Sequence, residues 1–229
     1  MDKKKIKEII DQTENFVKET LSKDSTGHDW WHVHRVINLA KRIAKEESAD
    51  IFIVEMSALL HDIGDYKFFN GDEKAGSVLV RNWLSSLDIP ASIVDKIAEI
   101  SSQISFLYTL PDEKVVAKKN SSITPCKELM IVTDADRLDA MGAIGIARAF
   151  TYGGNFKRSI YDPAIKTIKF VSKEEYKTTT APSINHFYEK LLKLKNMMYT
   201  KLGRKIAKRR HRFLKLYLKE FFKEWKGKL

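Results

Sequence analysis

Histidine and aspartate stand side by side at two places in the sequence, at His28-Asp29 and at His61-Asp62. Random placement of the composition predicts about 0.4 such doublets, so the surroundings of each doublet decide its meaning. The second doublet follows residues 51–60, an almost wholly apolar stretch that is typical of a buried helix. Burying both polar side chains is costly unless they pair with each other or bind a metal ion. A surface pair that caps the end of the helix is the alternative interpretation.

Further histidines and aspartates lie at spacings that suit one face of a helix. His28 and His32 are four residues apart and can share a face, whereas His34 must point elsewhere. Asp136 and Asp139 share a face at the end of another mainly apolar stretch. Two imidazoles with two carboxylates would neutralise a divalent ion, and they suit Mn, Fe, Co, Ni or Zn better than Mg. The sequence therefore predicts one divalent metal ion held inside a helical bundle.

Helical periodicity dominates the sequence, in which Gly and Pro are scarce, at 10 and 5 residues. We therefore expect an all-α fold. Weak alternation over residues 160–172 predicts one short hairpin or a flap, and residues 109–124 have the composition of a surface loop. The expected helices cover residues 6–21, 28–45, 51–60, 74–87, 90–104, 124–134, 141–150 and a long region from 182 onward that bends or breaks near Gly203.

Three segments, in this order, resemble the motifs of the HD-domain phosphohydrolases, whose signature is a His, then a His-Asp doublet, then a distal Asp. The segments are HVHRV at 32–36, HDIGD at 61–65 and DADRLD at 134–139. Other stretches are similar to a bacterial subgroup of small stand-alone HD proteins, some of them nucleoside-triphosphate pyrophosphohydrolases. These stretches are HDWWH at 28–32, residues 100–106 and GAIGIAR at 142–148.

The resemblance implies an HD helical bundle over residues 1–182, with a basic C-terminal helical extension over residues 183–229 packed on the same domain. It also implies roles for particular residues. The metal ligands would be His32, His61, Asp62 and Asp136. Asp65 matches an acid that related nucleotidases use beside the metal-bound water, and it would act as a general base or acid.

The phosphates of a substrate need cations of their own, because two carboxylates already balance the charge of the metal ion. The candidates that we expect to bind substrate are Arg35, Lys67, Lys74, Arg148 and His28. Each has a structural alternative. Arg35 would support the ligands, Arg148 would anchor Asp139, the two lysines would be solvated, and His28 would begin a helix.

The positions of the histidines limit the classes of reaction that fit this sequence. No histidine occurs between residues 62 and 186, and two-metal HD phosphodiesterases need additional histidines after the doublet. We therefore expect a one-metal phosphohydrolase that acts on a nucleotide or a similar phosphorylated small molecule. A nucleoside triphosphate pyrophosphohydrolase and a phosphomonoesterase both fit this description.

The formal net charge of +11 comes from the C-terminal part of the chain. Residues 186–229 carry +12, whereas the rest carries −1. The alternative function is therefore a non-catalytic HD scaffold that binds nucleic acid or an anionic surface through its basic C-terminal helices. No stretch approaches the ~18 apolar residues of a membrane span, and no signal-peptide core precedes the first helix. Together with a single cysteine, Cys126, these features predict a cytoplasmic protein, for which a homodimer is compatible with the sequence.

Overall fold

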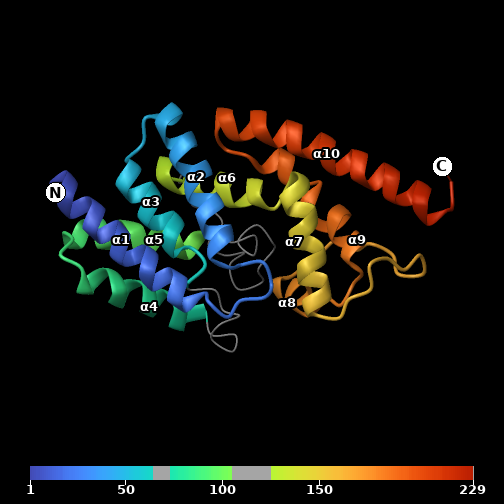
Figure 1. Cartoon of the computed structure of the whole chain (residues 1–229), viewed down its shortest axis with the longest axis horizontal. Helices are drawn as coiled ribbons and strands as arrows, with labels where there is room; N and C mark the ends of the chain where they lie inside the picture. Colours follow the sequence, from blue (N-terminus) through green and yellow to red (C-terminus); the bar gives the residue numbers. More distant parts are fainter. Residues whose placement is uncertain (64–72, 105–124, 229) are drawn as a thin grey trace. The chain divides into compact units, whose positions relative to one another are not determined.

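The computed structural model describes residues 1–63, 73–104 and 125–228, except for the side chains of residues 73–75. Within these residues every regular element is a helix (Figure 1), which confirms the predicted all-α class. The α-helices are α1 (Lys3–Thr20), α2 (Trp30–Glu47), α3 (Ile51–Leu60), α4 (Glu73–Ser86), α5 (Ala91–Gln103), α6 (Lys127–Asp139), α7 (Gly142–Asn155), α8 (Lys173–Thr178), α9 (Ser183–His186) and α10 (Lys201–Trp225). A π-helix, η3 (Phe187–Leu191), and a 3-10 helix, η4 (Leu194–Met197), lie between α9 and α10 in the sequence.

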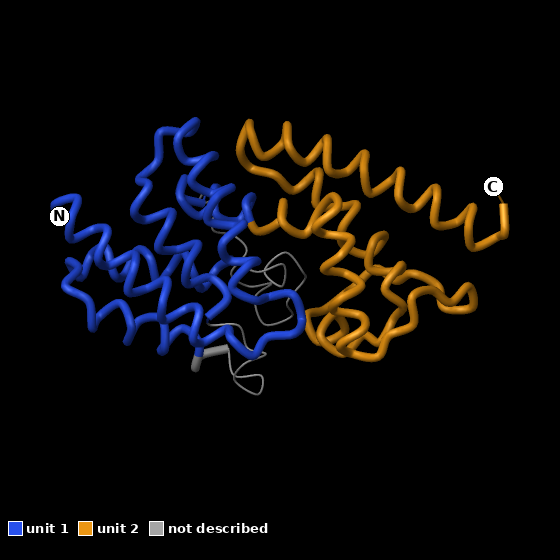
Figure 2. Tube along the Cα trace, in the orientation of Figure 1, with its two compact units in different colours: residues 1–109, 123–135 blue, residues 110–122, 136–229 orange. Residues whose placement is uncertain are grey.

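The chain divides into two compact units (Figure 2). Unit 1 comprises residues 1–109 and 123–135, and unit 2 comprises residues 110–122 and 136–229. Helix α6 contributes residues to both units. The domain boundary expected at residue 182 stays a prediction. No described helix is both long and apolar enough to cross a membrane.

Unit 1 is built around α3, which contacts α1, α2 and α5, while α4 packs on α5. Residues 53–60 of α3 are all buried, because this helix is almost wholly apolar and its one charged side chain, Glu55, pairs with Lys41. Asp50 caps its first turn, since the carboxylate accepts a hydrogen bond from the backbone N–H of Ile53 at 3.1 Å. The bounds of α3 match the prediction, and its buried position fixes where His61 and Asp62 emerge.

In unit 2, α10 packs against α7 and η4, and α7 packs against α9. The packing includes a stack of the Phe187 and Tyr217 rings, whose centroids lie 5.7 Å apart. One face of α10 supplies the buried residues Leu202, Gly203, Ala207, Leu214 and Leu218. The core of unit 2 therefore uses the apolar face of α10 and leaves the opposite face for solvent.

The break in the C-terminal helical region falls at residues 198–200, just before the expected Gly203. Met198 is extended, with ψ of 134°. Thr200 then caps α10, because its side chain accepts a hydrogen bond from the backbone N–H of Gly203 at 3.0 Å. Gly203 thus lies in the first turn of α10 and does not interrupt it.

The hairpin expected over residues 160–172 is wrong, because these residues form no strand in the described structure. Their backbone groups bond elsewhere: Glu189 accepts a hydrogen bond from the N–H of Ile168 at 3.2 Å, and Asn185 donates one to the carbonyl oxygen of Ile165 at 3.1 Å. The side chains of Ile165 and Ile168 are 44% and 41% exposed. The weak alternation therefore does not mark a buried strand face. The loop expected over 109–124 lies outside the described residues.

Candidate metal centre

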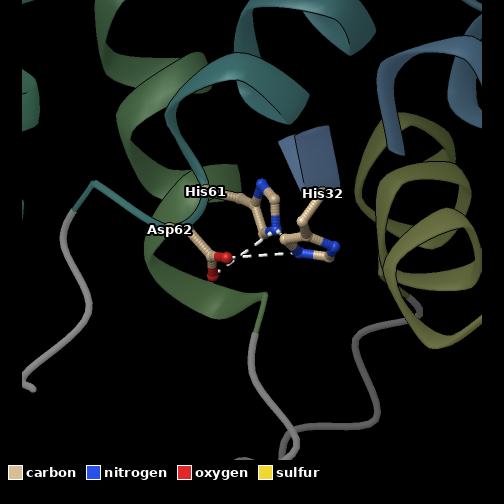
Figure 3. A group of neighbouring side chains, drawn as sticks. All are labelled: His32, His61 and Asp62. Carbon is tan, nitrogen blue, oxygen red and sulfur yellow. Dashed lines mark hydrogen bonds and ion pairs between the residues drawn. The ribbon is translucent and has the colours of Figure 1, made fainter. Parts of the chain in front are cut away.

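His32, His61 and Asp62 point toward one another in unit 1 (Figure 3). Nε2 of His32 lies 3.2 Å from Nε2 of His61 and 3.2 Å from Oδ2 of Asp62. Nε2 of His61 lies 3.5 Å from Oδ1 of Asp62. The three residues each offer a ligand atom, and these atoms lie within 4.8 Å of one another. Three of the four predicted metal ligands therefore lie together in one cluster.

Two helices place these side chains. Asp29 caps α2, because its carboxylate accepts a hydrogen bond from the backbone N–H of His32 at 2.9 Å. The imidazole of His32 is consequently held in the first turn of α2, where it is fully buried. His61 and Asp62 directly follow the last residue of α3 and are 5% and 8% exposed. In the first doublet the aspartate is thus a helix cap, whereas in the second it is a candidate ligand.

The backbone sets the tautomer of His61. Nδ1 of His61 lies 2.8 Å from the carbonyl oxygen of Ala58, and a carbonyl can only accept a hydrogen bond. In the neutral ring Nδ1 therefore carries the proton and donates it, which leaves the lone pair of Nε2 facing His32 and Asp62. Metal-binding histidines in proteins are commonly oriented by such a bond to a backbone carbonyl.

Asp62 is a buried carboxylate in this cluster. Burial alone raises the pKa of Asp62, but His61, His32 and His28 outweigh burial and hold this pKa well below its usual range. The group is therefore ionised at neutral pH. Its Oδ2 is buried and receives no hydrogen bond within the described residues, although Nε2 of His32 lies 3.2 Å away.

A divalent metal ion fits these residues. An ionised carboxylate oxygen without a hydrogen-bond donor and an imidazole lone pair converge in a buried place, where unsatisfied polar atoms are costly. Two imidazoles and a carboxylate are ligands that suit Mn, Fe, Co, Ni and Zn. Asp136, the predicted fourth ligand, lies in α6 and belongs to unit 2, so its participation stays a prediction.

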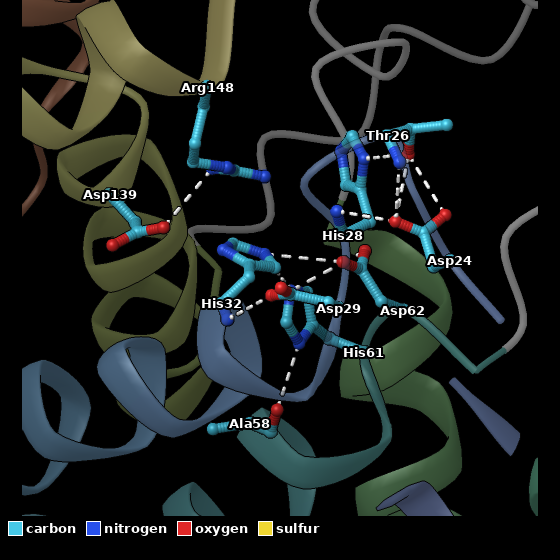
Figure 4. Close-up of polar contacts among 10 residues, drawn as sticks. All are labelled: Asp24, Thr26, His28, Asp29, His32, Ala58, His61, Asp62, Asp139 and Arg148. Carbon is cyan, nitrogen blue, oxygen red and sulfur yellow. Dashed lines mark hydrogen bonds and ion pairs between the residues drawn. The ribbon is translucent and has the colours of Figure 1, made fainter. Parts of the chain in front are cut away.

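A second polar network holds His28 (Figure 4). Oδ1 of Asp24 accepts hydrogen bonds from the backbone N–H groups of Thr26 and His28, both at 2.9 Å. The hydroxyl of Thr26 lies 3.0 Å from Nδ1 of His28, and the ring centroids of His28 and His32 are 5.7 Å apart. The sequence motifs do not identify Asp24 and Thr26, although an aspartate in a loop commonly accepts a hydrogen bond from the backbone N–H two residues further along the chain.

The structure describes only some of the other residues that were predicted to bind substrate or to act as a general base. Arg35 is partly buried on α2, one turn beyond His32. Arg148 donates a hydrogen bond to Oδ2 of Asp139 at 3.2 Å (Figure 4), which is the contact expected if it anchors Asp139. Asp65 and Lys67 lie outside the described residues, as does the side chain of Lys74. The substrate-binding and general-base roles of these residues stay predictions.

His34 faces away from the cluster, as its spacing from His32 requires. It is exposed, and its Nε2 lies 3.1 Å from the side-chain nitrogen of Asn38 on the same helix. His32 and His34 thus form a natural pair for comparison, one buried in the cluster and one on the surface of α2.

The helical fold and the buried His and His-Asp cluster are those of an HD domain, and the chain belongs to the HD-domain family. The family model for the HD domain matches residues 30–141. YpgQ of Bacillus subtilis, described as uncharacterized, is 35% identical over 217 residues, which cover 95% of this chain and 94% of YpgQ.

Solved structures support the same class. The structure of Bacillus subtilis YpgQ in complex with ADP has a TM-score of 0.70 and 32% identity, covering 94% of this chain and 97% of that chain. A structure described as an HD-superfamily hydrolase from Bacillus thuringiensis has a TM-score of 0.71 and 38% identity, covering 97% and 100%. A protein of Lactobacillus plantarum has a TM-score of 0.82 and 31% identity, covering 99% of both chains. These similarities support a metal-dependent hydrolase.

Proposed function

We propose that this protein is a metal-dependent phosphohydrolase that acts on a nucleotide or a similar phosphorylated small molecule. A nucleoside triphosphate pyrophosphohydrolase and a phosphomonoesterase are the two reactions that fit best. The observation that carries this proposal is the buried cluster of His32, His61 and Asp62, in which each residue offers a ligand atom and the Asp62 carboxylate is ionised.

The comparisons support the substrate class. The B. thuringiensis relative is described as an HD-superfamily hydrolase, and YpgQ has been crystallised with ADP. ADP carries a base, a sugar and two phosphates, so a nucleotide is the ligand class that this relative favours. A one-metal site with no further histidine up to residue 186 also favours small phosphate compounds over the substrates of two-metal phosphodiesterases.

His32, His61 and Asp62, with Asp136 as the predicted fourth ligand, would hold one divalent ion. Such an ion, when bound, supplies a water molecule of lowered pKa and a positive charge for a phosphoryl oxygen. The tautomer fixed by Ala58 keeps the lone pair of His61 available for binding.

The remaining steps fall to neighbouring residues. Asp65 would accept a proton from the attacking water or donate one to the leaving oxygen. Arg35, which lies one helical turn from His32, would orient a substrate phosphate with its guanidinium. His28 is oriented by the Asp24 and Thr26 network and would contact the substrate from the start of α2.

The experiment is a screen for turnover with matched variants. Protein stripped of metal is incubated with nucleoside mono-, di- and triphosphates and with Mn, Co, Ni or Mg, and both phosphate and pyrophosphate are measured. We expect release only when a metal is added. We expect His32→Ala to lower turnover at least ~100-fold, because a ligand is lost.

His34→Ala is the control for this experiment. It removes the same ring from the same helix but from an exposed position, so turnover should stay within about twofold of the original protein. Turnover without any metal, or an equal loss in the two variants, would show that the cluster is not the active centre.

A further inference from the structure

Helix α10 carries a straight row of cations on the face opposite its buried residues. Lys205, Lys208, Arg212, Lys215 and Lys219 follow one another at intervals of three or four residues, which places all five on one face of the helix. All five are exposed. The row extends over about 21 Å, because an α-helix rises 1.5 Å per residue.

Acidic side chains do not neutralise this row. Glu220 pairs with Lys223 at 3.0 Å, and within the part of the chain that the structure describes no carboxylate pairs with any cation of the row. Cations three or four residues apart repel each other and weaken a helix, whereas interleaved acids would strengthen it. Packing in unit 2 does not require the row, because the opposite face of α10 makes the contacts.

The positive charges of the row and their spacing indicate the kind of partner that it binds. We propose that it binds the phosphodiester backbone of double-stranded DNA, an interaction beyond the hydrolase activity proposed above. The duplex carries one negative charge per ~1.7 Å of its axis, so a row of about 21 Å meets closely spaced charges along its whole length. Lysine and arginine contacts to phosphates bind without reading sequence.

Other anionic partners fit the row less well. A single strand is bound by stacking its bases on aromatic side chains, and the face of α10 that carries the row has none. A helix on a membrane surface buries a continuous apolar face. Phe213 and Leu216 are 48% and 55% exposed, but they lie beside the row on the helix surface and two separate side chains form no such face.

The test uses the full-length protein and a fluorescent 30-base-pair duplex of arbitrary sequence, with affinity measured by anisotropy from 50 to 300 mM KCl. Each phosphate contact contributes about −0.9 to the slope of log affinity against log salt. Five contacts therefore predict a slope of about −4.5. The triple variant Lys205→Gln, Lys208→Gln, Arg212→Gln should lose about 2.7 of this slope and at least ~10-fold in affinity at 100 mM salt.

A second triple variant controls for net charge. Lys4→Gln, Arg42→Gln and Lys45→Gln remove three exposed cations from unit 1 and change the net charge equally. The affinity of this variant for the duplex should stay within about threefold of the original protein.

Three results would overturn the proposal. They are the absence of salt-dependent duplex binding, an equal loss of affinity in the two triple variants, and tighter binding to phosphatidylserine vesicles than to duplex at equal phosphate concentration.

Nucleotide turnover is measured on the same samples. Because the row contains no residue of the metal centre, turnover should be the same in the row variant and the original protein. If the protein does not hydrolyse nucleotides, the measurement of duplex binding still tests the DNA-binding proposal.

Discussion

At the scale of single residues, a backbone carbonyl decides how His61 can act. The bond from Nδ1 of His61 to the oxygen of Ala58 fixes the proton on the far nitrogen and leaves Nε2 facing His32 and Asp62. The types and order of these ligands were predictable, because the HD motifs name them. The fixed tautomer and the Asp24 and Thr26 network were not, because they depend on the local path of the backbone.

Asp65 is predicted to move a proton without holding the metal. Asp65→Asn keeps the size of the side chain but removes its basicity, so turnover should fall by roughly 10²- to 10⁴-fold. Metal content, measured by elemental analysis after dialysis, should stay equal to that of the original protein. If the asparagine variant loses metal together with turnover, Asp65 is a ligand instead.

The pKa of His186 gives a prediction for stability. Burial first, and then the nearby charges of Lys190 and Arg158, lower the pKa of His186 from 6.5 to about 3. Between these two pH values the unfolded chain binds a proton that the folded chain does not, so the free energy of unfolding falls as the pH drops. At pH 5 the loss from this residue is about 2 kcal/mol relative to pH 7.

Urea denaturation of the original protein and of His186→Gln at pH 7 and pH 5 measures this effect. The variant should lose about 2 kcal/mol less between the two pH values. Burial raises the pKa of Glu189, which acts in the opposite direction, but Glu189 is present in both proteins and cancels in the comparison. An identical change in the two proteins would show that folding does not hold His186 in its neutral form.

At the scale of elements, the helix caps link stability to the metal centre. Asp29→Ala and Asp50→Ala each remove an N-cap carboxylate, and each should lower the free energy of unfolding by about 1 kcal/mol. The cap of α2 bonds to His32 itself, so Asp29→Ala should also weaken manganese binding about 10-fold. Asp50 caps the end of α3 away from His61, so Asp50→Ala should leave this affinity within about threefold.

Chemical denaturation and calorimetric titration with Mn²⁺ on the two variants provide both measurements. Equal affinities for manganese, with equal losses of stability, would mean that the cap of α2 does not help to place His32.

The sequence predicted some elements better than others. Residues 51–60 match α3 because an aspartate cap marks the start of this helix and its almost wholly apolar run ends at the His61-Asp62 doublet. The break expected near Gly203 falls a few residues earlier, at 198–200, and the irregular path of residues 160–172 was missed, because tertiary contacts decide both. Thr200 caps α10, and Glu189 and Asn185 take the backbone bonds that a hairpin would have used.

At the scale of the whole molecule, metal binding should appear as thermal stability. An ion at 100 times its dissociation constant stabilises the folded chain by about 2.7 kcal/mol, which corresponds to roughly 5–10 °C in Tm for a chain of this length. His32→Ala should remove this shift. Asp136→Ala should reduce it as well if Asp136 is the fourth ligand.

Thermal unfolding with added Mn²⁺ and with EDTA checks this prediction, with His34→Ala as the control that keeps the full shift. A full shift in Asp136→Ala would remove Asp136 from the ligand set and leave the three clustered residues of unit 1 to hold the ion.

The burial of α3 on every side also bears on how this sequence can vary. The buried residues 53–60 form the centre of the unit 1 core and hold the backbone from which His61 and Asp62 emerge. An exchange of one apolar side chain for another in α3 therefore alters packing and ligand placement together. Among natural variants with an intact ligand set, differences in catalytic rate should accordingly map to α3 more often than to the exposed faces of α1 and α4.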